Sequence, residues 1–233
     1  MMRKLKFILI AILISLMIVT LTSCVLIRML DVIANESIRT FGELLEIVKV
    51  HDDGEFWSIV APDGEAAFFW NGHRARTVIN IQPFVDAGLD LETVQLSHLA
   101  RIEDGQIIIE IEFSSTALEN PEKTTPLGDF KNMVNYSRDN LKYHSDFDQF
   151  CIKPSGRGML ECLFKWAKDF STHDVTGQNQ EHDIMFVMSP APLITAGVDY
   201  NNVAGWEYAL VETMDERGRM SFEYKFIKHF DLI

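Results

Sequence analysis

Residues 83–94 read Pro-Phe-Val-Asp-Ala-Gly-Leu-Asp-Leu-Glu-Thr-Val, and residues 192–203 read Pro-Leu-Ile-Thr-Ala-Gly-Val-Asp-Tyr-Asn-Asn-Val. The two stretches share their Pro, Ala, Gly, Asp and final Val. Pro suits the first position of a helical turn, and Gly suits the left-handed position that ends it. The Asp that follows can accept hydrogen bonds from the backbone of the next turn. Each stretch therefore predicts a short helical turn with a sharp exit, which is a structural element and not an active site.

The surroundings of this motif repeat in the same order. Upstream of the first copy, Pro62-Asp63-Gly64 precedes Phe68-Phe69-Trp70, and upstream of the second, Pro154-Ser155-Gly156 precedes Phe164-Lys165-Trp166. Downstream, both copies lead into a strand, a turn and a second strand. A fixed order of several markers is the signature of an internal duplication. The sequence thus predicts an α+β fold, antiparallel and β-rich, made of two tandem copies of a helix–hairpin–strand–hairpin module.

The limits of the two modules follow from composition. We expect a first repeat over residues 24–118, a linker over 119–125 and a second repeat over 126–233. An amphipathic helical pattern runs from Leu26 to Val48, and the capping-box spacing of Thr40 and Glu43 predicts a new helix at Phe41 after a break near Asn35. Thr125 as N-cap and Pro126 as first helical residue predict a second-repeat helix that reaches about Leu141.

The strands are expected where β-type runs are bounded by turn residues. These runs are residues 56–60, 66–70, 78–81, 96–102, 106–113, 147–153, 159–166, 183–188, 205–213 and 220–228. A hairpin turn is predicted at residues 103–105. In the hairpin over 147–166, a register that pairs Lys153 with Leu160 also places Cys151 opposite Cys162. A helix over residues 159–170 is the alternative for the last of these strands.

The N-terminus has the features of an export signal. Arg3, Lys4 and Lys6 precede an apolar run over residues 7–21, which ends in Leu-Thr-Ser-Cys at residues 21–24. This ending resembles the lipobox of bacterial lipoproteins, and the resemblance covers residues 1–24 only. It implies removal of residues 1–23, a lipid on Cys24 and a domain held outside the cytoplasm at the cell membrane or outer membrane. Residues 25–30 remain largely apolar, so an uncleaved transmembrane anchor is the alternative.

The chain is acidic, with a formal net charge of −13. Removal of residues 1–23 takes away three cations and leaves 18 Lys and Arg against 34 Asp and Glu, a net charge of −16. A protein this acidic repels phosphate backbones, so we expect no nucleic-acid partner.

Two further cysteines bear on the redox state of the exported domain. Once Cys24 is acylated, Cys151 and Cys162 are the only thiols that remain. A disulfide persists outside the cytosol, and the register above would bring these two residues together. Two buried, reduced cysteines are the alternative.

A polar insertion over residues 171–183 is the main candidate for metal chemistry. It supplies nitrogen and oxygen ligands for a divalent metal, although their spacing matches no known ligand pattern. The candidate ligands are His173, Asp174, Glu181, His182 and Asp183. The alternative is a solvated polar loop without a cofactor.

No catalytic motif stands out elsewhere. The chain has no Gly-rich phosphate loop, no His-Glu-x-x-His helix and no Gly-x-Ser-x-Gly elbow. The tryptophans could form an exposed sugar or peptide platform, or lie in the core; they are Trp57, Trp70, Trp166 and Trp206. We therefore expect a non-catalytic surface lipoprotein that binds a partner protein, a glycan or a small ligand. A metal-dependent hydrolase that uses residues 171–183 is the alternative, and a structural envelope protein is a third possibility.

Overall fold

The structure, a computed structural model, describes residues 31–113, 123–136, 140–144, 149–152, 163–168, 170, 183–214 and 220–232. Residues 31–47 form a helix, and four strands, a short helix and two more strands follow it. The second half repeats this succession, beginning with α3 (Pro126–Tyr136). All strand pairs are antiparallel, so the predicted α+β, antiparallel and β-rich fold is confirmed.

Six strands of the first half form one sheet, called sheet A. They are β1 (His51–Asp52), β2 (Trp57–Val60), β3 (Ala66–Trp70), β4 (Arg74–Asn80), β5 (Ala100–Glu103) and β6 (Gln106–Glu112). Their order across the sheet is β1-β2-β3-β4-β6-β5, and α2 (Gln82–Asp86) connects β4 to β5. The predicted turn at 103–105 is present, with Asp104 at φ 48° and Gly105 at φ 75°. Two successive positive φ values match the right-handed twist of the flanking strands.

Six strands of the second half form sheet B. They are β7 (Leu141–His144), β8 (Gln149–Ile152), β9 (Phe164–Ala167), β10 (Ile184–Met188), β11 (Glu207–Met214) and β12 (Met220–Phe230). Their order is β7-β8-β9-β10-β12-β11, and α4 (Ala191–Thr195) connects β10 to β11. Sheet B therefore has the strand order and connectivity of sheet A.

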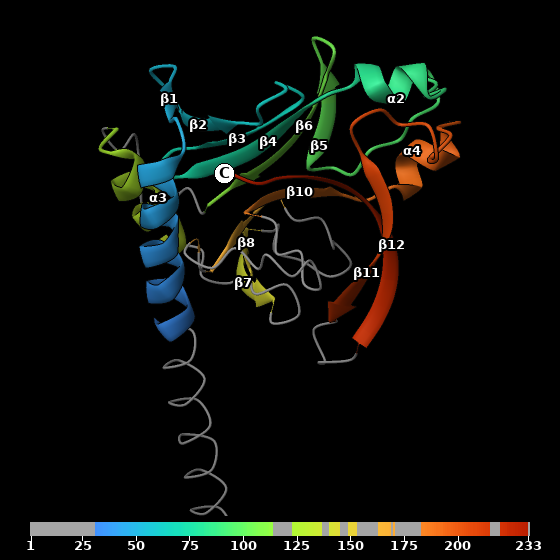
Figure 1. Ribbon diagram of the computed structural model, residues 1–233. Helices are drawn as coiled ribbons and strands as arrows, with labels where there is room; N and C mark the ends of the chain where they lie inside the picture. The colour runs from blue at the N-terminus through green and yellow to red at the C-terminus, as the bar shows by residue number, and fades with distance from the viewer. Residues whose placement is uncertain are drawn as a thin grey trace, which may run out of the picture.

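The two sheets face each other and share one hydrophobic core (Figure 1). Phe68 of sheet A stacks on Phe164 of sheet B, with ring centroids 4.5 Å apart. The helix over residues 31–47 stands beside α3 at one side of the sheets, where Phe41 stacks on Phe130 at 3.7 Å. This core thus joins residues of both halves, and a smaller cluster on the outer face of sheet B belongs to the second half alone.

The two copies of the motif meet at the other side of the sheets. Gly88 has φ 101° and Gly197 has φ 99°, so the predicted positive φ at both glycines is confirmed. The Asp90 amide donates to the Ala196 carbonyl, and the Asp199 amide donates to the Ala87 carbonyl, both at 2.8 Å. This reciprocal pair of hydrogen bonds relates the two copies by an approximate twofold.

Three local predictions are wrong. The helix over residues 31–47 continues through Asn35 without a break. α3 ends at Tyr136, and Leu141, expected at the end of that helix, begins strand β7. Residues 164–167 form strand β9, so the alternative helix over residues 159–170 is also wrong.

The predicted register of the β8–β9 hairpin is wrong as well. Cys151 lies opposite Lys165, three positions from the predicted partner, and Phe150 lies opposite Trp166. Side chains alternate between the two faces of a strand, so an error of three positions places Trp166 on the wrong face. The observed register instead sets the fully buried Trp166 beside Phe150, with ring centroids 5.8 Å apart.

Candidate functional site

Most of the predicted site residues lie outside the described residues. This applies to Cys24, Cys162, His173, Asp174, Glu181 and His182. Asp183 is buried, and its carboxylate accepts a hydrogen bond of 2.8 Å from the Leu232 amide. Asp183 therefore holds the C-terminal segment against β10. Across the ranges that the structure describes, no three His, Cys, Asp or Glu side chains form a group suited to a metal ion. No helix in those ranges is long and apolar enough to cross a bilayer.

Cys151 is disulfide-bonded and fully buried on sheet B. Its predicted partner Cys162 lies outside the described residues. The residue opposite Cys151 on β9 is Lys165, so this disulfide does not join two directly opposed residues of the ladder.

Lys165 shares the outer face of sheet B with Cys151. It is 2% exposed, and burial together with the positive charge of Lys225 lowers its pKa from its ordinary value to about 8. Lys225 is itself buried and forms a 3.1 Å ion pair with Glu223. The lowered pKa of Lys165 makes the free energy of unfolding depend on pH in the alkaline range.

We expect the free energy of unfolding to rise by about 2 kcal/mol between pH 7 and pH 9.5, since one pKa unit corresponds to about 1.4 kcal/mol. The pKa of Lys165 is lower in the folded state, so the unfolded chain binds more protons above pH 8, and stability rises with pH there. Lys165→Met should remove this rise. Urea unfolding of both proteins across that pH window measures it, and identical pH profiles would refute the assignment.

The tryptophans do not form an exposed platform. Trp70 and Trp166 are fully buried, and Trp206 is 8% exposed. Trp57 is partly buried, and its indole N–H donates to Asp129 at 2.7 Å. The indole N–H of Trp70 donates to the Pro126 carbonyl and that of Trp166 donates to Thr40, at 2.8 and 2.9 Å. These residues therefore join the two halves of the core, and the suggested sugar or peptide platform at these positions is wrong.

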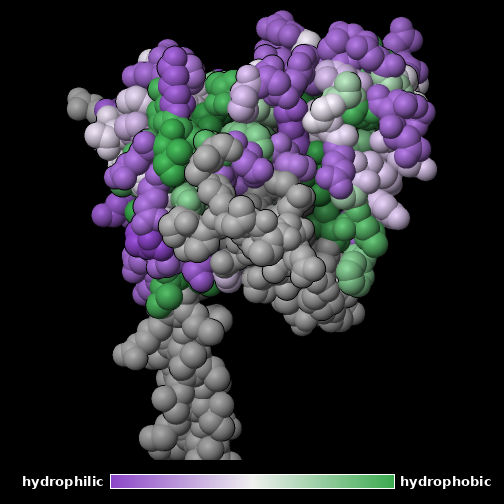
Figure 2. Space-filling model, viewed as in Figure 1, coloured by the Kyte–Doolittle hydropathy of each residue, from purple (hydrophilic) through white to green (hydrophobic). Residues whose placement is uncertain are grey.

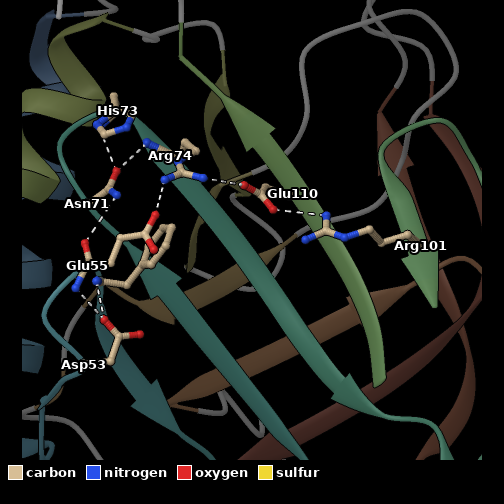
Figure 3. A network of polar contacts seen from close by, with 8 residues as sticks. Asp53, Glu55, Asn71, His73, Arg74, Arg101 and Glu110 are labelled. Carbon is tan, nitrogen blue, oxygen red and sulfur yellow. Dashed lines mark hydrogen bonds and ion pairs between the residues drawn. The ribbon is translucent and has the colours of Figure 1, made fainter. Parts of the chain in front are cut away.

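A network of charged side chains covers the outer face of sheet A (Figure 3). Arg74 forms ion pairs with Glu55 and Glu110, and Arg101 reaches the other oxygen of Glu110 at 3.1 Å. Asn71 accepts hydrogen bonds from the amides of His73 and Arg74, at 3.1 and 2.8 Å. The network ties the loop before β2 to strands β4, β6 and β5.

This network has a structural role. Glu110 lies between two arginines, and its two carboxylate oxygens hold Arg74 and Arg101 in place. The neighbouring Arg76 packs its guanidinium 4.2 Å from the ring centroid of Phe56 and 4.8 Å from that of Phe69. Arg76 is thereby held against the sheet by aromatic contacts.

Among the described residues, exposed aromatic and aliphatic side chains gather on the β11–β12 hairpin and the neighbouring motif. This group is called the hairpin surface and consists of Tyr200, Leu210, Phe222 and Tyr224 together with the half-buried Tyr208. Leu210 is 53% exposed, Phe222 is 64% exposed and Tyr224 is 51% exposed. Figure 2 shows hydrophobic surface over this hairpin, at the lower right of the molecule. Aromatic residues exposed together in this way mark binding surfaces more often than isolated apolar residues do.

The rings of the three tyrosines of the hairpin surface pack against one another. The ring centroid of Tyr208 lies 4.4 Å from that of Tyr200 and 4.8 Å from that of Tyr224. Burial and the two neighbouring phenols raise the pKa of Tyr208. The hydroxyl of Tyr208 therefore stays protonated at neutral pH and is available as both donor and acceptor.

The position of the hairpin surface is set by the length of the hairpin. In sheet A, Ile102 pairs with Ile107, and only one further pair, Glu103↔Gln106, comes before the turn. On its other side, Ile107 pairs with Ile79 of β4. The residue of β10 that corresponds to Ile79 is Met188, and Met188 pairs with Phe226. Tyr208↔Phe226 is thus the corresponding pair in sheet B, and that hairpin continues to Met214↔Met220. Leu210, Phe222 and Tyr224 lie in an extension that sheet A lacks.

Sequence reasoning predicted these strands and missed the surface. The alternation of Phe222, Tyr224 and Phe226 on β12 indicates one apolar face, but it does not show where that face leaves the core. The usable signal was the difference in length between the two predicted hairpins.

Comparisons with known proteins add no assignment: no family model, no curated protein and no solved structure matches the chain.

Proposed function

We propose that this protein is a membrane-anchored, exported lipoprotein that acts by binding and not by catalysis, with the hairpin surface as its docking site. The export signal and the Leu-Thr-Ser-Cys ending at residues 21–24 support the anchor. The observation that carries the binding function is the exposure of Leu210, Phe222 and Tyr224 on one face of a hairpin extension. Apolar side chains gain little for folding when they remain in water, so their gathering at one place favours a contact with another molecule.

We also propose that the chain consists of two copies of one module. The equal strand order of the two sheets, the equal backbone conformation of the two motifs and their reciprocal hydrogen bonds support this origin. In this arrangement the first copy keeps a short, charged hairpin, and the second copy carries the extension. The scaffold is then the paired modules, and the binding function resides in the part by which they differ.

Membrane attachment is expected to depend on Cys24. Cys24→Ala removes the thiol that receives the lipid, so the chain should remain an uncleaved precursor without acyl labelling. Labelling of cells with a radioactive fatty acid, followed by gel electrophoresis, measures both effects. Normal processing of the variant would contradict the lipoprotein assignment.

Contact through the hairpin surface is expected to yield a discrete cross-linked product. A photoreactive amino acid in place of Leu210 should form one adduct of higher mass when intact cells are irradiated. The same amino acid in place of Ile47 is a matched control, because Ile47 is 49% exposed and Leu210 is 53% exposed. Ile47 ends the helix over residues 31–47, which stands at the side of the sheets away from the two motifs and the hairpin extension. Adducts in equal amount at both positions, or at neither, would contradict a docking site on the hairpin.

A further inference from the structure

We infer that the partner of the hairpin surface is a protein segment that combines basic with apolar side chains. This inference rests on the proposed binding function and adds the chemical class of the partner. Two features of the described residues carry it: the distribution of charge around the hairpin surface, and the kind of aromatic side chain that it exposes.

Among the described residues, the exposed charges around the hairpin surface are negative. Within residues 183–214 and 220–232, the only Lys or Arg residues are Lys225 and Lys228, which are 3% and 6% exposed. Lys225 pairs with Glu223, and Lys228 pairs with Asp63. Of the exposed carboxylates of this region, Asp199 lies in the motif next to Tyr200, whereas Glu207 lies on the opposite face of β11. The positive charges are thus buried, while negative charges remain at the surface.

The first motif adds to this acidic rim. It packs against the second motif beside Tyr200, and it exposes Asp86, Asp90 and Glu92. Residues 82–99 contain no Lys or Arg. The sequence between β11 and β12, residues 215–219, has two acidic residues and two arginines and so adds no net charge. A partner with Lys or Arg side chains therefore meets complementary charge along most of the rim.

The exposed aromatic residues suit the same partner. Tyr and Phe rings attract Lys and Arg side chains through their π faces, while Leu210 and Phe222 offer apolar contact to aliphatic side chains. Tyr208 and Tyr224 stack on each other with planes 9° apart. A neutral glycan has no positive group to meet the acidic rim, so it is a poorer match than a protein segment with Lys or Arg side chains.

A second copy of this chain is disfavoured on electrostatic grounds. After removal of residues 1–23, two copies would each bring a net charge of −16 and an acidic rim to the same interface. Like charges brought together at an interface are unfavourable, and no Lys or Arg in residues 183–214 or 220–232 is exposed to relieve them. Self-association is accordingly an outcome that the experiment must distinguish.

The test uses the full-length protein in a non-ionic detergent and two labelled octapeptides, one of alternating Lys and Val and one of alternating Glu and Val. We expect the Lys–Val peptide to bind about tenfold more tightly than the Glu–Val peptide, as measured by fluorescence anisotropy. Leu210→Ser and Tyr224→Ser should each weaken Lys–Val binding by about tenfold, because they remove apolar and aromatic contact. Ile47→Ser, which changes an aliphatic side chain of similar exposure outside the hairpin surface and its acidic rim, should leave the binding constant within about twofold.

Several outcomes would overturn the inference. Equal binding of the Lys–Val peptide to the wild type and to both hairpin variants would show general attraction to an acidic protein. Equal or tighter binding of the Glu–Val peptide would refute the charge preference. A concentration-dependent dimer that Leu210→Ser abolishes would assign the surface to a second copy. If the photoreactive residue at position 210 forms its adduct but the Lys–Val peptide does not bind, the docking function stands and the basic partner is refuted.

Discussion

Phe41→Ala is expected to lower the free energy of unfolding by about 3 to 5 kcal/mol, the range for truncation of a large aromatic side chain in a core. Phe41 is fully buried, and its ring centroid lies 3.7 Å from that of Phe130 and 5.3 Å from those of Trp70 and Trp166. Truncation opens a cavity where the two helices meet both sheets. Because the surrounding rings belong to both halves of the chain, neither half can close the cavity alone.

The measurement is urea unfolding of the full-length protein in detergent, followed by tryptophan fluorescence and by circular dichroism. Both signals should move together in one transition, since the core is shared. Phe222→Ala removes the same side chain from a position that is 64% exposed, and it should change stability by less than about 0.5 kcal/mol. Two separate transitions, of which Phe41→Ala shifts only one, would show that the halves fold independently.

The parts of the fold that sequence reasoning predicted are those with local causes. The hairpin turn at residues 103–105 and the positive φ of Gly88 and Gly197 follow from the preferences of the turn residues themselves. Thr125 acts as the predicted N-cap of α3, since its hydroxyl accepts a hydrogen bond of 3.0 Å from the Gly128 amide. In each case the residue and its nearest neighbours along the chain decide the conformation.

The errors arose where a distant contact decided the outcome. Thr40 was predicted to cap a new helix, but it lies inside one, fully buried, where it accepts the indole N–H of Trp166. Strand β1 was missed because it has two exposed residues and is defined only by its pairing with β2. The β8–β9 register was predicted with Cys151 opposite Cys162, whereas packing of Trp166 against Phe150 and Phe164 in the core fixed the observed register.

The hairpin surface was not predicted from the sequence, for a related reason. Leu210, Phe222 and Tyr224 have the composition and alternation of core residues. The predicted strand lengths indicated a longer second hairpin, but the strand pairing shows where it runs past the end of the shorter hairpin in the other sheet. A functional interpretation of these residues therefore required the topology and not the pattern alone.

Gly197→Ala is expected to lower the free energy of unfolding by about 2 to 4 kcal/mol, from backbone strain and a close contact together. Gly197 has φ 99°, and a Cβ there would lie 2.9 Å from the carbonyl oxygen of Gly88. That oxygen belongs to the backbone, so the two motifs must move apart. Their separation weakens the hydrogen bonds from Asp90 to Ala196 and from Asp199 to Ala87.

Gly64→Ala separates the two causes of this loss. Gly64 also has a positive φ, 77°, but a Cβ there meets no atom within 4 Å, so this variant should lose only about 1 kcal/mol. Gly88→Ala should resemble Gly197→Ala, because its Cβ would lie 3.0 Å from the Gly197 carbonyl oxygen. The double variant should lose less than the two single losses added, since one separation of the motifs relieves both contacts. Thermal unfolding of all four proteins measures these differences, and equal losses for Gly64→Ala and Gly197→Ala would show that the motifs do not pack this closely.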